Sequence, residues 1–181
     1  MSCDPAIRNR RSIRLKGYDY TLEGAYFVTI CTQNRKCLFG DIIDGEMHLN
    51  DAGKILQTTW DDLPNHYPHI ELDESVIMPD HFHGIIWIMD GHPDVDGRVS
   101  NPPLRPPHDT NAIPNADGRR THGLPEIIRA LKTFSSRRIN ELRKSPGSKI
   151  WQRNYWDYII RNDRDLERIR TYIQNNPSKW H

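Results

Sequence analysis

The stretch from Ser75 to Met89 constrains the fold most, because apolar runs flank Asp80-His81-Phe82-His83 on both sides. We interpret it as two extended segments with a tight junction at Met78-Pro79-Asp80. Side chains alternate across a strand with period two, so His81 and His83 point to one face and Phe82 points to the other, into a core. Two adjacent imidazoles on a strand are half of a divalent-metal site, although a surface histidine pair on a hairpin has the same pattern.

The rest of the chain predicts an α+β fold with the ferredoxin-like split βαβ order. The expected architecture is an antiparallel sheet with helices on one face and an extra C-terminal helix. Strands are expected at 25–32, 70–78, 81–89 and 155–160, with a further extended segment at 150–152. Helices are expected at 51–62, 124–144 and 164–175, and a β-hairpin at 38–49 turns at Asp44-Gly45.

Length and composition favour one compact domain over residues 1–181. Residues 1–20 form a basic arm that leads to Tyr18 and Tyr20, and residues 90–122, rich in Gly and Pro, form a long loop insertion. The mean hydropathy of −0.77 and the lack of a long apolar run exclude a membrane span or secretion signal. The three cysteines are too few and too irregularly spaced for a disulfide framework, so we expect a reducing cytoplasm.

The net charge of +1 hides a segregation along the chain. Residues 21–118 carry a net charge of −11, residues 119–181 carry +9, and residues 1–20 carry +3. If the basic ends converge on one surface, that surface attracts a polyanion such as a nucleic acid. An ordinary solvated helix face is the alternative.

The C-terminal helix has an apolar side made of Leu166, Ile169 and Ile173. Tyr172 and Asn176 are four positions apart, so their side chains are neighbours one turn apart, with about 6 Å between Cβ atoms. Taken alone, a surface tyrosine and an asparagine before proline fit packing and helix termination equally well.

In combination, these motifs resemble those of the REP-associated tyrosine transposases, single-tyrosine members of the HUH superfamily of single-strand DNA nucleases and transposases. The motifs are Met78-Pro-Asp-His-Phe-His83, Trp151-Gln-Arg-Asn-Tyr-Trp-Asp157 and Tyr172-Ile-Gln-Asn-Asn-Pro177. The resemblance runs from about Arg14 to Trp180 but leaves out the loop at 91–122.

The resemblance implies that His81, His83 and Asn176 hold a divalent ion, Mg²⁺ or Mn²⁺, and that Tyr172 is the catalytic nucleophile. Attack on a phosphate then gives a 5′-phosphotyrosine and a free 3′-OH. Because the ester is conserved, strands are rejoined without ATP, so no nucleotide cofactor is expected. The phenol needs help to ionise near pH 7, from the metal and from an arginine such as Arg168 or Arg170, but the sequence identifies no general base.

The resemblance also implies that the partner is single-stranded or hairpin DNA with a short guide sequence. Trp156 is a further aromatic that either stacks on a base or packs. Tyr155 and Tyr158 are rival nucleophiles, for which packing or stacking is the better interpretation. The candidate DNA contacts are Arg8, Arg10, Arg11, Arg14, Lys132, Arg137, Arg138, Arg153, Trp151 and Tyr155.

Three alternatives stay open at the level of sequence. The first is a non-catalytic hairpin-binding protein derived from such a transposase, against which the intact catalytic set argues. The second is a small metallohydrolase or cupin-like enzyme, which the helices disfavour because cupins are all-β. The third is RNA processing. The resemblance favours a cytoplasmic, nucleoid-associated monomer over a helix-swapped dimer.

Overall fold

The computed structural model describes residues 18–89 and 122–180, which contain one four-stranded antiparallel sheet. The strand order is β4-β5-β1-β6, and every neighbouring pair is antiparallel. The strands are β1 (Gly24–Cys31), β4 (Ile70–Met78), β5 (His81–Ile88) and β6 (Trp156–Ile160). The cations of the N-terminal arm and nearly all of the predicted loop insertion lie outside the described residues.

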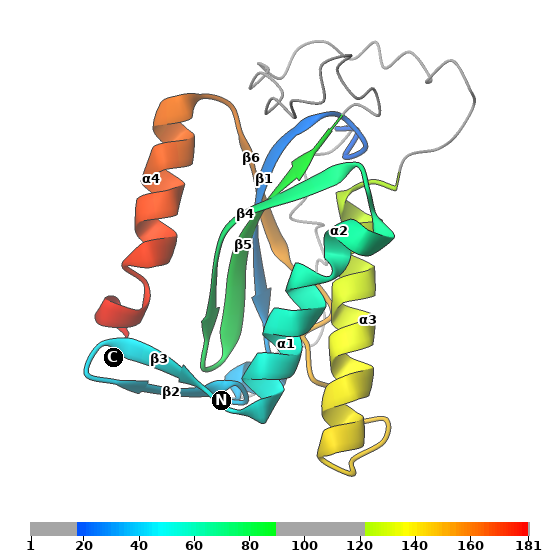
Figure 1. The fold of residues 1–181 in the computed structure, drawn as a ribbon, viewed down its shortest axis with the longest axis vertical. Helices are drawn as coiled ribbons and strands as arrows, with labels where there is room; N and C mark the ends of the chain where they lie inside the picture. Colours follow the sequence, from blue (N-terminus) through cyan, green and yellow to red (C-terminus); the bar gives the residue numbers. More distant parts are fainter. Residues whose placement is uncertain (1–17, 90–121, 181) are drawn as a thin grey trace, which may run out of the picture.

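Helices cover both faces of this sheet (Figure 1). Helices α1 (Asp51–Asp61) and α3 (Leu124–Leu142) lie side by side on one face, and α4 (Asp163–Gln174) lies on the other. The predicted ferredoxin-like order and the extra C-terminal helix are thus confirmed. Within the described part of the chain, no helix is long and apolar enough to cross a membrane.

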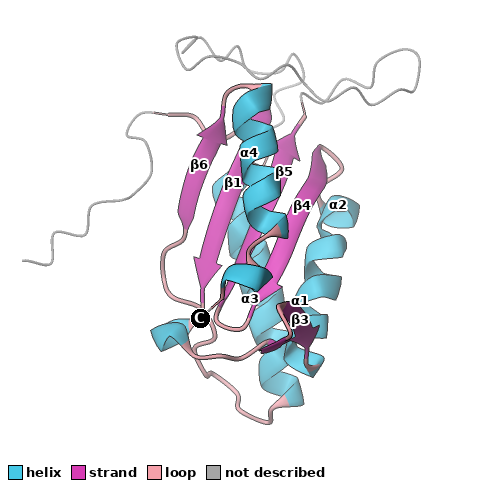
Figure 2. Ribbon diagram, turned by 90° about the vertical axis from the view of Figure 1, so that its left-hand side faces the viewer, coloured by secondary structure: helices cyan, strands magenta, loops and turns pink. Residues whose placement is uncertain are grey.

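The smaller elements lie near one end of the sheet (Figure 2). Strands β2 (Gly40–Ile43) and β3 (Glu46–Leu49) form the predicted hairpin. Two short 3-10 helices are η2 (Gln33–Arg35), directly after β1, and η3 (Pro177–Lys179), directly after α4.

Two local predictions were wrong, those for the segment 150–152 and for Tyr20. The segment 150–152 is not a strand but a single bridge between Trp151 and Thr32, and β6 begins at Trp156. Helix α1 ends at Asp61, within one residue of the prediction, and Pro64 lies in the first turn of a separate short helix, α2 (Leu63–His66). Tyr20 is not part of a free arm; its ring is buried in the core.

Strand β5 is buried along its whole length because both faces are covered. Phe82 and Ile86 belong to the core shared with α1 and α3, whereas Ile85 and Trp87 belong to the core shared with α4. By alternation, the two histidines of β5 lie on the α4 side. The fold therefore presents them to the helix that carries Tyr172.

Gly84 allows α1 to approach β5 closely. A Cβ at this position would lie 2.7 Å from Cη2 of the Trp60 indole and 2.8 Å from Cζ of Phe82. The Trp60 and Phe82 rings pack with their centroids 4.7 Å apart. The glycine after the second histidine thus serves packing, on the face opposite to the histidines.

Candidate active site

The candidate site begins with the register of the sheet. His83 pairs with Thr29 of β1 and Val76 of β4, and Thr29 also pairs with Trp156 of β6. Paired residues of antiparallel strands point to the same face. A row of four side chains therefore crosses the α4 face of the sheet in the order Val76, His83, Thr29, Trp156. His81 lies two residues before His83, with its ring centroid 4.6 Å from that of His83.

The hydrogen bonds of His83 leave one ring nitrogen directed at Tyr172. Its Nδ1 is 2.8 Å from Oγ1 of Thr29, and its Nε2 is 3.4 Å from the Tyr172 hydroxyl. The His83 and Tyr172 ring centroids are 5.4 Å apart. The Phe27 ring stacks on the His83 ring, with the centroids 5.3 Å apart. The phenol from the last helix therefore meets the histidine of the central strand.

His81 is held by a carboxylate. Its Nδ1 lies 2.5 Å from Oδ1 of Asp80, and the other oxygen of Asp80 accepts from Nε of Arg35 at 2.9 Å. The Asn176 side chain lies near enough to His81 to raise the pKa of this histidine, and the Trp180 ring centroid lies 5.9 Å from that of His81. The structure thus brings together His81, His83, Tyr172 and Asn176, which the motifs singled out.

Helix α4 is capped at its N-terminus and is held to β4 by an ion pair further along. Asn162 caps its N-terminus by accepting from the backbone N–H of Asp165 at 2.8 Å. Further along, Arg170 makes a two-pronged ion pair with Asp73, with contacts of 2.9 and 2.6 Å. Asp73 lies in β4 beside a register irregularity between Leu72 and Ser75.

Several hydrogen bonds hold Asp73 ionised. Burial raises the pKa of this carboxyl, but hydrogen bonds from Arg170, Trp87 and the Glu74 backbone outweigh it and hold the pKa below its ordinary value. The ion pair fixes the helix two residues before Tyr172, whose side chain remains 46% exposed. The nucleophile candidate is thus positioned and still open to solvent.

Both histidines are neutral at pH 7. Burial lowers the pKa of His81 and outweighs Asp80 and Asn176, which raise it. Burial also lowers the pKa of His83, to about 3, and the neighbouring His81 and Arg35 act in the same direction. A neutral imidazole keeps the lone pair that a metal ion requires.

The donor set fits a divalent ion. If Nδ1 of each histidine carries its proton toward Asp80 or Thr29, both Nε2 lone pairs are free for a metal, the carboxylate–histidine arrangement of many metal sites. Within residues 18–89 and 122–180, no group of three or more His, Cys, Asp or Glu side chains is placed to hold a metal. The third protein ligand would be the amide oxygen of Asn176, an oxygen donor suited to Mg²⁺ or Mn²⁺.

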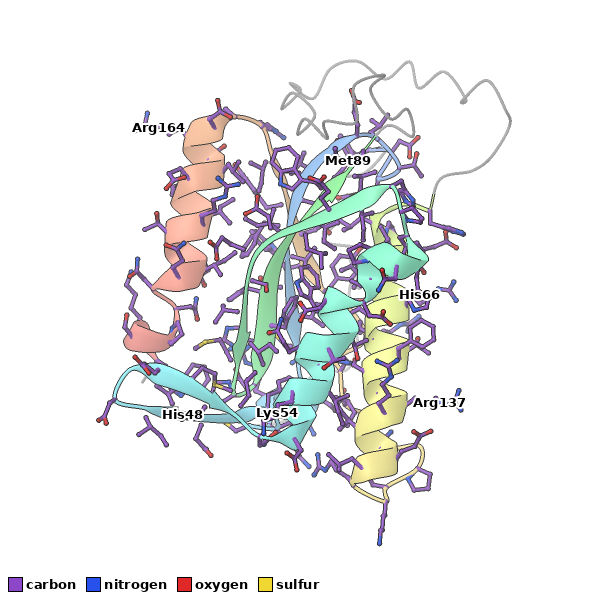
Figure 3. All side chains as sticks on the ribbon, viewed as in Figure 1. His48, Lys54, His66, Met89, Arg137 and Arg164 are labelled. Atoms are coloured by element: carbon purple, nitrogen blue, oxygen red, sulfur yellow. The ribbon has the colours of Figure 1, made fainter. Side chains whose placement is uncertain are left out.

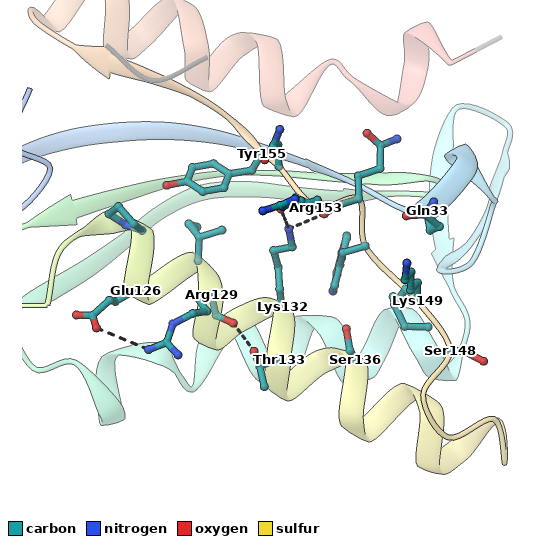
Figure 4. Close-up of a pocket in the computed structure, with 16 residues that line it drawn as sticks. Gln33, Glu126, Arg129, Lys132, Thr133, Ser136, Ser148, Lys149, Arg153 and Tyr155 are labelled. Atoms are coloured by element: carbon teal, nitrogen blue, oxygen red, sulfur yellow. Dashed lines mark hydrogen bonds and ion pairs between the residues drawn. The ribbon is translucent and has the colours of Figure 1, made fainter. Parts of the chain in front are cut away.

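Several predicted DNA contacts meet in a groove of about 1100 Å³ between α3 and the segment 148–155 (Figure 4). Four basic side chains and one acidic side chain line it: Arg129, Lys132, Lys149, Arg153 and Glu126. Nζ of Lys132 donates to the carbonyl oxygens of Gln152 and Arg153 at 2.6 and 3.0 Å, so this lysine fixes the groove wall. The groove is therefore basic, as a phosphate backbone requires.

Other predicted DNA contacts lie elsewhere. Arg137 projects from α3, on the other side of the sheet from α4 (Figure 3), and pairs with Glu141, while Arg138 donates to Thr59 of α1. Trp151 lines the groove wall but is only 6% exposed, and its indole donates to Ser135, so it presents no open face to a base. The predicted stacking role of Trp151 is therefore not supported.

The rival tyrosines lie apart from the histidine pair. Tyr155 lines the groove on the α3 side of the sheet. Tyr158 is on the α4 side, but its hydroxyl donates to Asp165 near the start of α4, at 3.1 Å. Of the three tyrosines, Tyr172 is the one whose hydroxyl approaches a histidine nitrogen.

Sequence reasoning assigned no role to three residues of the site. Asp80 was available as a signal, because a carboxylate directly before the first histidine can orient it. Thr29 could be found only from the strand register. Arg35 follows Asn34 in a turn where both residues have positive φ, 59° and 54°, so its approach to Asp80 depends on a backbone conformation that the sequence does not announce.

No family model matches the chain. A Haemophilus influenzae protein described as uncharacterized is 42% identical over 178 residues, which cover 96% of this chain and 91% of that protein. A putative REP-associated tyrosine transposase of the same organism is 27% identical over 161 residues, 89% of this chain and 74% of that protein. A solved REP-associated tyrosine transposase bound to a REP hairpin has the same fold, with a TM-score of 0.56, 20% identity, and 90% of this chain and 72% of that chain covered.

Proposed function

We propose that the chain is a REP-associated tyrosine transposase, like the relative to which it is 27% identical over 161 residues, and that it acts as a metal-dependent single-strand DNA endonuclease and transposase. It binds hairpin DNA, cuts one strand through Tyr172 and rejoins strands by the reverse step. The observation that carries the proposal is the contact between Tyr172 and His83, 3.4 Å from hydroxyl to Nε2.

The reaction is a phosphodiester exchange. The Tyr172 oxygen forms a bond to the phosphorus of the scissile phosphate, and the bond from phosphorus to the 3′ oxygen breaks. The products are a 5′-phosphotyrosine and a free 3′-OH, and the phenolic proton is balanced by the proton gained at the 3′ oxygen. One ester replaces another, so a 3′-OH can reverse the step without ATP.

Asp80 and Thr29 prepare the histidines for this chemistry. Each contacts an Nδ1, at 2.5 and 2.8 Å, and so directs the Nε2 lone pairs of His81 and His83 into the site. Together with the Asn176 amide these nitrogens would hold Mg²⁺ or Mn²⁺. When bound, the ion supplies charge that polarises and orients the phosphate.

Arg35 supplies fixed positive charge at the same place. Its guanidinium pairs with Asp80, and its side chain is about half exposed. An arginine fork that is held by a carboxylate on one side can offer its remaining N–H donors to a phosphate oxygen. Arg35 thus supports phosphate binding next to His81.

Two features support hairpin DNA as the partner and a monomer as the active form. The solved relative is described as bound to a REP hairpin, and this chain has a basic groove beside β6. Helix α4 follows β6 after two residues and packs on its own sheet, so one chain completes the set of His81, His83, Tyr172 and Asn176.

Labelled single-stranded hairpin DNA from the gene's own flanks tests the proposal, with Mn²⁺ present. We expect a shorter labelled strand and a protein–DNA adduct that survives denaturation. Binding without cleavage at any metal concentration would favour the non-catalytic hairpin-binding protein instead. Equal cleavage of the matched RNA hairpin would favour RNA processing.

A further inference from the structure

Trp156 is a large aromatic side chain left open beside the candidate active site. It is 41% exposed, close to the 46% of Tyr172. It pairs with Thr29, the residue that contacts His83, so its side chain is on the same face of the sheet as the histidines and α4. In the same row His83 is buried and Val76 and Thr29 are half-buried, so Trp156 is its most exposed side chain.

Ring contacts connect Trp156 to the catalytic residues. Its ring meets Phe27 edge-on, with the centroids 5.7 Å apart, and Phe27 contacts both His83 and Tyr172, at 5.3 and 6.2 Å. Tyr158 stacks on Trp156 nearly parallel, at 15° and 6.2 Å. The indole is thus held in a fixed orientation by two rings, while much of its surface faces solvent.

The position of β6 leaves room for a ligand. It is the edge strand of the sheet, paired with β1 alone among the described strands. Figure 2 shows α4 lying over β1 and β5, whereas the start of β6 stands clear of that helix. Trp156 is the first residue of β6, and its exposure of 41% shows that its side chain is open to solvent.

The basic groove leads to the same place from the other face. Tyr155 lines the groove, and Trp156 follows it directly in sequence. Since side chains alternate along an extended chain, the two rings point to opposite sides of the sheet edge. Arg153 and Lys149 lie in the groove just before them. A single strand held in the groove can therefore pass around the β6 edge and reach Trp156 and then Tyr172.

We propose that Trp156 is a stacking site for one unpaired nucleobase adjacent to the phosphate that Tyr172 attacks. This inference rests on the proposed function and adds the residue that fixes the strand beside the scissile bond. Aromatic stacking accepts any base, because every base has a π face. The site thus orders the strand without reading its sequence.

The test couples a protein change to a DNA change. Trp156→Ala should weaken binding of the hairpin substrate roughly 5- to 150-fold, while Trp156→Phe should bind nearly as the wild type does. An abasic nucleotide is then placed at each unpaired position beside the cut site in turn. At one position, the abasic site should weaken wild-type binding by the same factor and leave Trp156→Ala binding unchanged.

Phe134→Ala is the matched control, because Phe134 is a ring of similar exposure, 42%, on α3 and the opposite face. It should bind as the wild type does. Binding of the hairpin by Trp156→Ala with wild-type affinity would overturn the proposal. The proposal would also be overturned if, at every unpaired position, an abasic nucleotide weakened binding to Trp156→Ala by the same factor as binding to the wild type. Absence of a wild-type adduct would instead reject the proposed function, while the binding cycle would still report on stacking.

Discussion

The hydroxyl of Tyr172 lies 3.4 Å from Nε2 of His83, although 89 positions separate the two residues in sequence. The same Nε2 would bind a metal ion, since Nδ1 is already occupied by Thr29. One lone pair cannot serve both partners. The phenol and the ion therefore compete for His83, and metal binding releases the hydroxyl that is to attack phosphate.

Replacing Tyr172 with Phe should accordingly tighten Mn²⁺ binding in the absence of DNA. The lost hydrogen bond is long, so we expect roughly a 2- to 10-fold gain in affinity. Calorimetric titration measures it. Tyr158→Phe, which removes a hydroxyl bonded to Asp165 instead, is the control and should leave the affinity unchanged. Equal affinities for wild type and Tyr172→Phe would mean that the two partners do not compete.

Replacing Asp80 with Asn should weaken Mn²⁺ binding by about 10- to 100-fold, because the carboxylate orients His81 and raises its basicity. The same titration gives the result. Asp62→Asn is the matched control, because Asp62 also pairs with a histidine, His66, but on the surface. A loss of affinity no larger than that of the control would remove Asp80 from the site.

Acid should destabilise the protein through its buried histidines. The folded-state pKa of His83 is lowered to about 3 from the ordinary 6.5, so in the range between these values the unfolded chain binds a proton that the folded chain does not. The stability present above pH 6.5 is therefore lost as the pH falls toward 3, at up to about 1.4 kcal/mol per pH unit.

Urea unfolding of wild type and His83→Asn at several pH values measures this effect. The carboxylates contribute to both proteins, so the comparison isolates the histidine. The free energy of unfolding of His83→Asn should fall less steeply between pH 6 and pH 4. Parallel curves for the two proteins would show that His83 does not titrate in the expected way.

The ion pair between Arg170 and Asp73 should contribute more to the free energy of unfolding than the exposed ion pair between Arg168 and Asp165 on the same helix. Arg170→Ala leaves Asp73, which is largely buried, without its partner and should cost about 1.5–3 kcal/mol of unfolding free energy. Arg168→Ala breaks an exposed pair with Asp165 and should cost less than about 1 kcal/mol. Thermal or urea unfolding compares them; equal costs would contradict the anchoring role.

The sheet, the shared face of the two histidines and the proximity of Tyr172 to Asn176 could be predicted from the sequence because their signals are local and periodic. Alternation placed His81 and His83 on one face, and a four-residue spacing placed Tyr172 beside Asn176. The sequence also contains a signal, not used in the prediction, that a helix covers the second face of the sheet. Residues 85–89 are apolar without alternation, which indicates a strand buried on both sides and hence a helix on each face.

The contacts that set the site could not be predicted in the same way. The pairing of Asp73 with Arg170 joins residues 97 positions apart, and the position of Arg35 depends on two consecutive positive φ angles. The two tryptophans of the aromatic motif at 151–157 also differ in burial, which the sequence did not indicate. Trp151 is buried through a bridge to Thr32, while Trp156 remains open on β6. Composition treats these two tryptophans alike; only the three-dimensional neighbours distinguish them.

Mapping the covalent adduct by mass spectrometry tests the central claim most directly. Wild-type protein is incubated with Mn²⁺ and single-stranded hairpin DNA from the gene's flanks, digested with protease and nuclease, and searched for a tyrosine that carries a 5′-linked nucleotide. The account predicts the modification on Tyr172 and its absence in Tyr172→Phe, which should still bind the DNA. A nucleotide on Tyr155 or Tyr158, or an adduct that persists in Tyr172→Phe, would contradict it.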